Sequence, residues 1–205
     1  MTLTADLAGH DAAYLALAAR ASEPYDAFVY ADLAQAAQVH AALHAADAGD
    51  AARSFGRLWL DGTTALGMIA CVPGAALTRT RIRAALALRK AGLLADPAAV
   101  RRTQLAGQAL ARPDDDAYYL ARIAVDERGR GRGLGAALVA AFEAEARSAG
   151  ARSLVLEVSP AHAAAIRLYQ RAGFTIVDTR QAHDEPSQRT LIYHHMAKTL
   201  DGGRR

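Results

Sequence analysis

The chain has 205 residues, a formal net charge of +3, 52% hydrophobic residues and 6% aromatic residues. This length allows one domain with a buried core, and many alanines with few aromatics favour helices over an all-β sandwich. The mild positive charge is compatible with an anionic ligand but gives no reason to expect nucleic acid as a partner. No run of 18 apolar residues occurs, so we expect no membrane-spanning helix and no membrane partner.

The N-terminal residues and the cysteine usage bear on the compartment. The stretch MTLTADLAGHD has neither the charged n-region nor the apolar h-region of a signal peptide. Cys71 is the one cysteine, which excludes an internal disulfide and fits a reducing environment. It lies in an apolar run, so we predict a small buried side chain rather than a nucleophile. We therefore expect a cytoplasmic protein.

The first part of the chain predicts helices followed by a hairpin. Residues 11–20 have the pattern of a short helix, which the segment SEPYDAF ends with Pro24 as the breaker. Residues 31–47 predict a second helix. Residues 54–72 predict two strands joined at Asp61-Gly62, a favoured hairpin turn. No strand is recognisable before residue 50.

Residues 75–112 differ in character, because they are basic and helical. Asp96 and Pro97 predict the start of a second helix in this segment, with the aspartate as N-cap and the proline at the first helical position. The simplest interpretation of the basic residues is a solvated face. The alternative is a docking surface for an anionic partner or for the second subunit of a homodimer. The basic residues concerned are Arg79, Arg81, Arg83, Arg89, Lys90, Arg101, Arg102 and Arg112.

From residue 117 onward, strands and helices alternate. Residues 117–125 predict a strand, and residues 134–149 a helix whose apolar stripe is interrupted by Glu145. A strand within 153–159, a helix within 161–172 and two closing strands follow. This order predicts an α/β fold with a βαβ unit at its centre. We expect one domain over 1–205, with a helical insertion at about 75–112 and a loose tail at about 201–205.

The stretch VDERGRGRGLGAAL joins the first of these strands to its helix. A helix N-terminus carries unpaired N–H groups and about half a positive charge, and glycine lets a ligand approach the backbone closely. The turn therefore predicts a phosphate or pyrophosphate site. Arg130 and Arg132 add positive charge beside Gly131, Gly133 and Gly135.

Two common phosphate motifs fit this turn poorly. A P-loop is excluded because no Gly-Lys-Ser/Thr follows. A dinucleotide fingerprint can be written as Gly131-x-Gly133-x-x-Ala136, with Glu157 near the position of a ribose-binding acid. However, Asp126 to Arg130 separate the strand from the first glycine, and no second nucleotide-binding half follows. An NAD(P)-dependent oxidoreductase is therefore the weaker alternative.

At these residues the sequence resembles a known family. RGRGLG, residues 130–135, matches the Arg/Gln-x-x-Gly-x-Gly/Ala motif of the GNAT superfamily of N-acetyltransferases. LVLEVSPAHAAAIRLYQRAGF, residues 154–174, is similar to the strand and the Asn-x-x-Ala-x-x-Leu-Tyr-x-x-x-Gly-Phe helix of that family, especially as found in ribosomal-protein alanine N-acetyltransferases. The resemblance covers residues 117–198 well and the hairpin loosely.

The resemblance implies a fold and a coenzyme. It implies a mixed, mostly antiparallel central sheet flanked by helices, acetyl-CoA as co-substrate and no metal. The turn would wrap the coenzyme pyrophosphate, and the end of the preceding strand would splay from its neighbour and pair with the pantetheine arm. The implied coenzyme-binding residues are Ile123, Ala124, Val125, Arg130, Gly131, Arg132, Gly133, Leu134, Gly135, Ala136 and His162.

Acetyl transfer to an amine needs a base, a stabilised oxyanion and a proton for the leaving thiolate. Tyr169 matches the family tyrosine whose hydroxyl points at the coenzyme sulfur, so it is the candidate acid. Glu157 is the candidate base because it interrupts an otherwise apolar strand and has the spacing to Tyr169 of the resembling enzymes that use this glutamate. A water chain to bulk solvent is the alternative to Glu157. Backbone N–H groups near residues 123–125 would hold the oxyanion.

Several other polar residues are less clearly linked to a function. His162 stands where the family usually has asparagine, so its coenzyme contact would survive in altered form. His194 and His195 lack acids or cysteines at ligand spacing and are expected to be structural. The run Asp114 to Asp116 is interpreted as a solvated loop.

The sequence thus predicts an N-acetyltransferase that moves an acetyl group to a primary amine by direct attack in a ternary complex. A non-catalytic acyl-CoA-binding or sensor module is the alternative from another class. The acceptor, a small molecule or a peptide amine, cannot be identified from the sequence.

Overall fold

The computed structural model describes residues 2–200 and forms a seven-stranded sheet in the order β1-β2-β3-β4-β5-β7-β6. All neighbouring strands are antiparallel except β4 and β5, which are parallel. The strands are β1 (Thr2–Thr4), β2 (Gly56–Asp61), β3 (Thr64–Pro73), β4 (Ala117–Val125), β5 (Ser153–Val158), β6 (Thr175–Asp184) and β7 (Arg189–Thr199). The expected mixed, mostly antiparallel sheet with a central βαβ unit is confirmed.

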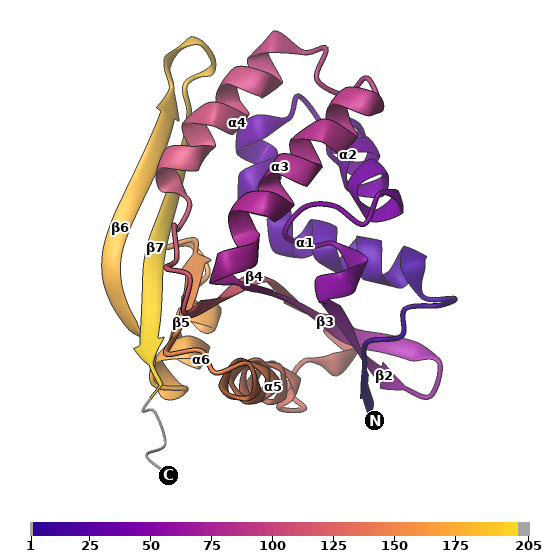
Figure 1. Cartoon of the computed structure of the whole chain (residues 1–205), viewed down its shortest axis with the longest axis vertical. Helices are drawn as coiled ribbons and strands as arrows, with labels where there is room; N and C mark the ends of the chain where they lie inside the picture. Colours follow the sequence, from indigo (N-terminus) through magenta and orange to yellow (C-terminus); the bar gives the residue numbers. More distant parts are fainter. Residues whose placement is uncertain (1, 201–205) are drawn as a thin grey trace.

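Helices cover both faces of this sheet (Figure 1). The crossover helix α5 and the shorter α6 lie on one face, and α1 to α4 lie on the other. The helices are α1 (Asp11–Val29), α2 (Leu33–Ala45), α3 (Gly74–Lys90), α4 (Pro97–Ala109), α5 (Leu134–Ser148) and α6 (Ala163–Arg171). Among the described residues, no helix has both the length and the apolar character needed to cross a membrane.

The α5 face carries the larger apolar core. Leu138 and Phe142 of α5 pack with strand residues such as Leu154 and Met196, all almost fully buried. Glu145, which interrupts the apolar stripe of α5, accepts a hydrogen bond from the hydroxyl of Tyr118 at 2.8 Å. It also pairs with Arg57 at 3.1 Å. Because the carboxylate is paired, this helix can present it toward the sheet without an unsatisfied charge.

Helix α1 is longer than the sequence predicts, because the break expected at Pro24 does not occur. The helix runs without interruption from Asp11 to Val29 and contains Pro24. An internal proline costs one helical hydrogen bond and about 3 kcal/mol. Packing offsets this cost, since both ends of α1 are buried: Tyr14 and Leu17 before the proline, and Phe28 and Val29 after it.

Three other features can be compared with the predictions from the sequence. Cys71 is buried, as expected. The short strand β1, which pairs with β2, was missed because three residues carry no recognisable alternation. Asp96 caps α4 through the N–H of Ala98 at 2.9 Å, as predicted. The tail expected at about 201–205 lies outside the described residues.

Candidate active site

The glycine-arginine turn forms an open cradle at the start of α5. Gly131 and Gly133 have φ values of 73° and 76°, in the left-handed region that favours glycine. A Cβ built on either would meet no other described atom within 4 Å, apart from its chain neighbours. The first N–H groups of α5, from Leu134 to Ala136, have no partner within the helix. Open space, free donors and the helix dipole together fit an anionic group such as a pyrophosphate.

The other residues of the turn have distinct roles. Gly135 faces α6, where an added Cβ would lie 3.1 Å from Leu168 Cδ2, so this glycine allows close packing of the two helices. Arg130 and Arg132 are exposed. Arg132 pairs with Asp61 at 3.2 Å and Arg130 with Glu127 at 3.9 Å. Both arginines therefore have acidic partners of their own at the mouth of the cradle.

Strand β4 leaves one backbone edge free just before this turn. It pairs with β5 only from Ala117 to Leu120, whereas its pairing with β3 continues to Val125. Within the described chain, residues 121–125 therefore have no strand partner on the β5 side. The sequence predicted that these strands splay apart here. The free N–H and C=O groups suit an extended amide-containing ligand, which can add to the edge like another strand.

A single cavity of about 650 Å³ connects the two parts of the site. At one end it is lined by Arg130, by the free edge of β4 and by His162 and Tyr169. It continues past Glu157 to a region enclosed by α1, α2, α3 and α4. This volume is typical of small-molecule sites. The helices of residues 75–112 are thus a wall of the cavity rather than only a solvated face.

Tyr169 lies in the cavity wall and is 4% exposed. Its ring meets Phe174 edge-on, with centroids 6.0 Å apart and planes at 60°. Burial raises the pKa of the phenol, because the ionised form would lose its hydration. The side chain is therefore present as a proton donor at neutral pH. Its position is fixed by α6 and by the Phe174 contact.

Glu157 lines the same cavity and is held by two donors. Its carboxylate accepts hydrogen bonds from the N–H of Ala111 and from the hydroxyl of Tyr119. Burial nevertheless raises the pKa of the carboxyl, although those bonds and the charges of His195 and Arg81 act in the opposite direction. A carboxylate with a raised pKa in a cavity wall is suited to accept a proton near neutral pH.

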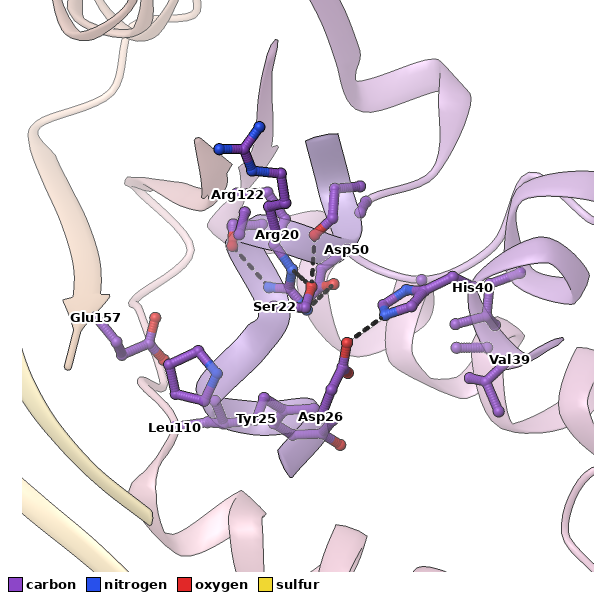
Figure 2. Close-up of a pocket in the computed structure, with 18 of the residues that line it drawn as sticks. Arg20, Ser22, Tyr25, Asp26, Val39, His40, Asp50, Leu110, Arg122 and Glu157 are labelled. Atoms are coloured by element: carbon purple, nitrogen blue, oxygen red, sulfur yellow. Dashed lines mark hydrogen bonds and ion pairs between the residues drawn. The ribbon is translucent and has the colours of Figure 1, made fainter. Parts of the chain in front are cut away.

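The far part of the cavity contains a polar cluster that the sequence analysis missed (Figure 2). Arg122 of β4 donates to Ser22 Oγ at 2.6 Å and pairs with Asp50 at 3.5 Å. Asp26 Oδ2 lies 2.7 Å from His40 Nε2. Ser22 and Asp26 are four residues apart on α1, so they share one helix face. Because a helix break was predicted at Pro24, the sequence did not indicate that these two residues share a helix face.

A set of arginine contacts, here called the arginine clamp, joins α4 and the end of α1 to the β6–β7 hairpin. Arg101 of α4 forms two hydrogen bonds to Asp184, at 2.9 and 3.2 Å, and Arg102 Nε donates to the carbonyl of Val29 at 2.7 Å. Arg189 of β7 donates to the carbonyl of Tyr30. These bonds join α4, the end of α1 and the hairpin. Arg102 is buried, which corrects the expectation of a purely solvated basic face for this residue.

The remaining predicted polar residues lie in different surroundings. His162 precedes α6 and is exposed at the cavity. His195 Nε2 lies 2.7 Å from the carbonyl oxygen of Ala109, and His194 Nδ1 lies 2.8 Å from Thr179 Oγ1. Within residues 2–200, no group of three or more histidine, cysteine or acidic side chains is placed to hold a metal ion. The three aspartates before β4 are exposed, as expected for a loop.

One protein-family model matches part of the chain. Residues 75–174 match the family model described as "Acetyltransferase (GNAT) family". No curated protein sequence matches the chain.

Solved structures match over nearly the whole chain. A crystal structure described as that of an acetyltransferase has a TM-score of 0.66 and 19% identity, covering 98% of this chain and 100% of the other. Ribosomal-protein-alanine N-acetyltransferase from Brucella melitensis gives 0.56 and 16%, with coverages of 98% and 100%. A putative acetyltransferase from Salmonella typhimurium, solved with its cofactor acetyl-CoA, gives 0.55 and 15%, with coverages of 100% and 96%.

At these identities the structural matches show a shared fold, while the family model matches the segment that contains the cradle, β4 and Tyr169. Residues 75–174 thus match the acetyltransferase (GNAT) family model, and the described chain shares its fold with solved acetyltransferase structures.

Proposed function

We propose that the protein is an acetyl-CoA-dependent N-acetyltransferase that moves the acetyl group to a primary amine by direct attack in a ternary complex. The observation that carries the proposal is the single cavity that runs from the cradle and the free edge of β4 to Glu157 and the polar cluster on α1. One continuous space can hold coenzyme and acceptor together. No covalent relay through a protein nucleophile is then needed, and Cys71 is buried with its pKa raised by desolvation.

The coenzyme-binding residues in this proposal are the backbone of the cradle and of β4. Gly131 and Gly133 leave room for a pyrophosphate, and the N–H groups from Leu134 to Ala136 would bind it. The free edge from Ile123 to Val125 would pair with the amide-containing arm and direct one N–H at the carbonyl oxygen of the acetyl group. Acetyl-CoA supplies the activated thioester.

Two side chains carry the proton transfers in the proposal. Glu157 accepts the proton of the attacking amine, directly or through a water molecule, and burial supports this role because it raises the pKa of the carboxyl. Tyr169 donates a hydrogen bond to the departing sulfur. Its own pKa is raised by burial, so full proton transfer to a thiolate is uphill. The phenol therefore stabilises the developing charge through its hydrogen bond, and coenzyme A leaves as a thiolate that takes its proton from solvent.

The experiment has two stages. Calorimetric titration with acetyl-CoA and with NADH tests whether the cradle is selective for the coenzyme A group. Thiol release is then followed with acetyl-CoA and a panel of primary amines and peptides with free N-termini. We expect acetyl-CoA binding and amine-dependent thiol release. Binding of acetyl-CoA without turnover of any amine would indicate a non-catalytic acyl-CoA-binding module. Binding of NADH without binding of acetyl-CoA would contradict the proposed coenzyme and therefore the proposed function.

A further inference from the structure

Asp26 is a buried carboxylate with one oxygen unused. The residue is 5% exposed and lines the cavity. Its Oδ2 lies 2.7 Å from His40 Nε2, whereas its Oδ1 is buried and has no hydrogen-bond partner among residues 2–200. Leaving a buried acceptor without a hydrogen-bond partner costs free energy. A ligand that donates a hydrogen bond to Oδ1 would recover this cost.

The neighbouring cations of the protein do not fill this role, because their donors are used elsewhere. All three guanidinium nitrogens of Arg122 have partners: Nε donates to Ser22, one terminal nitrogen donates to the carbonyl of Ala121, and the other pairs with Asp50. Arg102 donates to the carbonyl of Val29. The Asp26 carboxylate therefore keeps a site for a donor that comes from outside the protein.

The walls around this site indicate the chemical character of the rest of the ligand. Beyond Asp26 the cavity is bounded by apolar side chains of α2, of α3 and of the segment that leads to α4: Leu43, Leu88, Leu93 and Leu94. Tyr25 and Tyr30 add aromatic surface from the end of α1. This largely apolar lining suits an acceptor with an apolar or aromatic body.

We propose that Asp26 is the residue that selects the acceptor, and that the acceptor is a small molecule with a cationic amine attached to an apolar or aromatic body. The amine donates to Asp26 Oδ1, and the body lies against the leucines and tyrosines of the apolar end. This inference rests on the proposed acetyltransferase function. The contact is made in the binding complex, before the amine loses its proton, and no bond forms or breaks at Asp26.

The test compares two probes that differ only in the charged group. Protein saturated with coenzyme A is titrated calorimetrically with 2-phenylethylamine and with 2-phenylethanol. We expect the wild-type protein to bind the amine at least about tenfold more tightly, which corresponds to about 1.4 kcal/mol. Asp26→Asn keeps the shape of the side chain and removes its charge, so it should reduce this preference to less than about threefold.

Glu23→Gln is the matched control, because it makes the same change of charge on the exposed side of the same helix. It should keep the tenfold preference. If Asp26→Asn does not fold, Asp26→Glu preserves the charge but moves the oxygens, and it should weaken binding of the amine while leaving binding of the alcohol unchanged.

Distinct outcomes separate this inference from the proposed function. Absence of coenzyme A binding would contradict the proposed function, and the amine titration can then still be made on the protein alone. A preference that persists in Asp26→Asn, or that wild type lacks, would overturn the role of Asp26. Turnover with peptide N-termini and with none of the small amines would overturn the assigned acceptor class.

Discussion

The two ends of the cavity are built in different ways. The end proposed to bind the coenzyme, here called the coenzyme end, uses backbone from one continuous segment, β4 through the start of α5, with glycines that leave space. The end proposed to bind the acceptor, here called the acceptor end, uses side chains from α1, α2, α3 and α4. A backbone site requires particular residues at fixed spacing, so it leaves a motif in the sequence. A site made of side chains from distant segments leaves no such motif. For this reason the sequence predicted the coenzyme end but not the acceptor end.

The largest expected effect lies where the two ends meet. Tyr169→Phe keeps the ring and its contact with Phe174 but removes the proton donor. The value of kcat should fall by roughly 10²–10⁴-fold, while the Kd for acetyl-CoA should stay nearly constant because the loss is confined to the transition state. Tyr118→Phe, which removes the hydroxyl that donates to Glu145 of α5, is the control, because Tyr118 is not among the residues that line the cavity. A defect mainly in Kd would instead make Tyr169 a coenzyme-binding residue.

The next effect concerns Glu157. Because burial raises the pKa of its carboxyl, the deprotonated base should appear only above the ordinary glutamate value of about 4.3. The pH profile of kcat/KM should therefore rise through a limb displaced to higher pH. Glu157→Gln should lower kcat/KM by about 10²-fold and remove that limb. A variant that retains the limb at the same pH would show that a water chain, and not Glu157, carries the proton.

A change at the coenzyme end should affect only the coenzyme. Gly133→Asp places a side chain and a negative charge in the open cradle, and aspartate tolerates a left-handed backbone better than most residues. The Kd for acetyl-CoA should rise by more than about tenfold, measured by calorimetry. Gly9→Asp is the control, because Gly9 also has a left-handed backbone and open space around it but lies before α1. Equal affinities for both variants would contradict the assignment of the cradle.

The smallest effect is a test of how the acceptor end is held together. Arg101 holds the pKa of Asp184 at about 2, below its usual range, so this pair stabilises the fold above about pH 4 and the contribution is lost as the pH falls toward 2. Asp184→Asn should lower the Tm by roughly 2–4 °C at pH 7. The difference from wild type should shrink as the pH drops below about 4. A difference that does not depend on pH would mean that the charge of Asp184 is not what matters.

The sequence predicted most elements of the sheet and the helices after residue 31, because hydrophobic periodicity and turn residues reflect local geometry. It predicted an anion-binding turn from the glycines and arginines before α5, and the splay of β4 through the resemblance at residues 130–135. Helix α1 was predicted to end early because the cost of Pro24 is local, whereas the packing of Phe28 and Val29 that offsets it is not. The pairing of Asp26 with His40 depends on that continuous helix, so it could not be inferred either.

The free edge of β4 also has a consequence for solubility. Unpaired strand edges invite pairing with other chains and so promote aggregation. Here the unpaired groups of residues 121–125 lie in the interior of the sheet, between β4 and β5, and they face the cavity rather than the outer rim. They are therefore not part of either outer edge strand, β1 or β6. The fold can therefore leave these backbone groups unpaired for an extended ligand without exposing them on an outer strand, where they would promote aggregation.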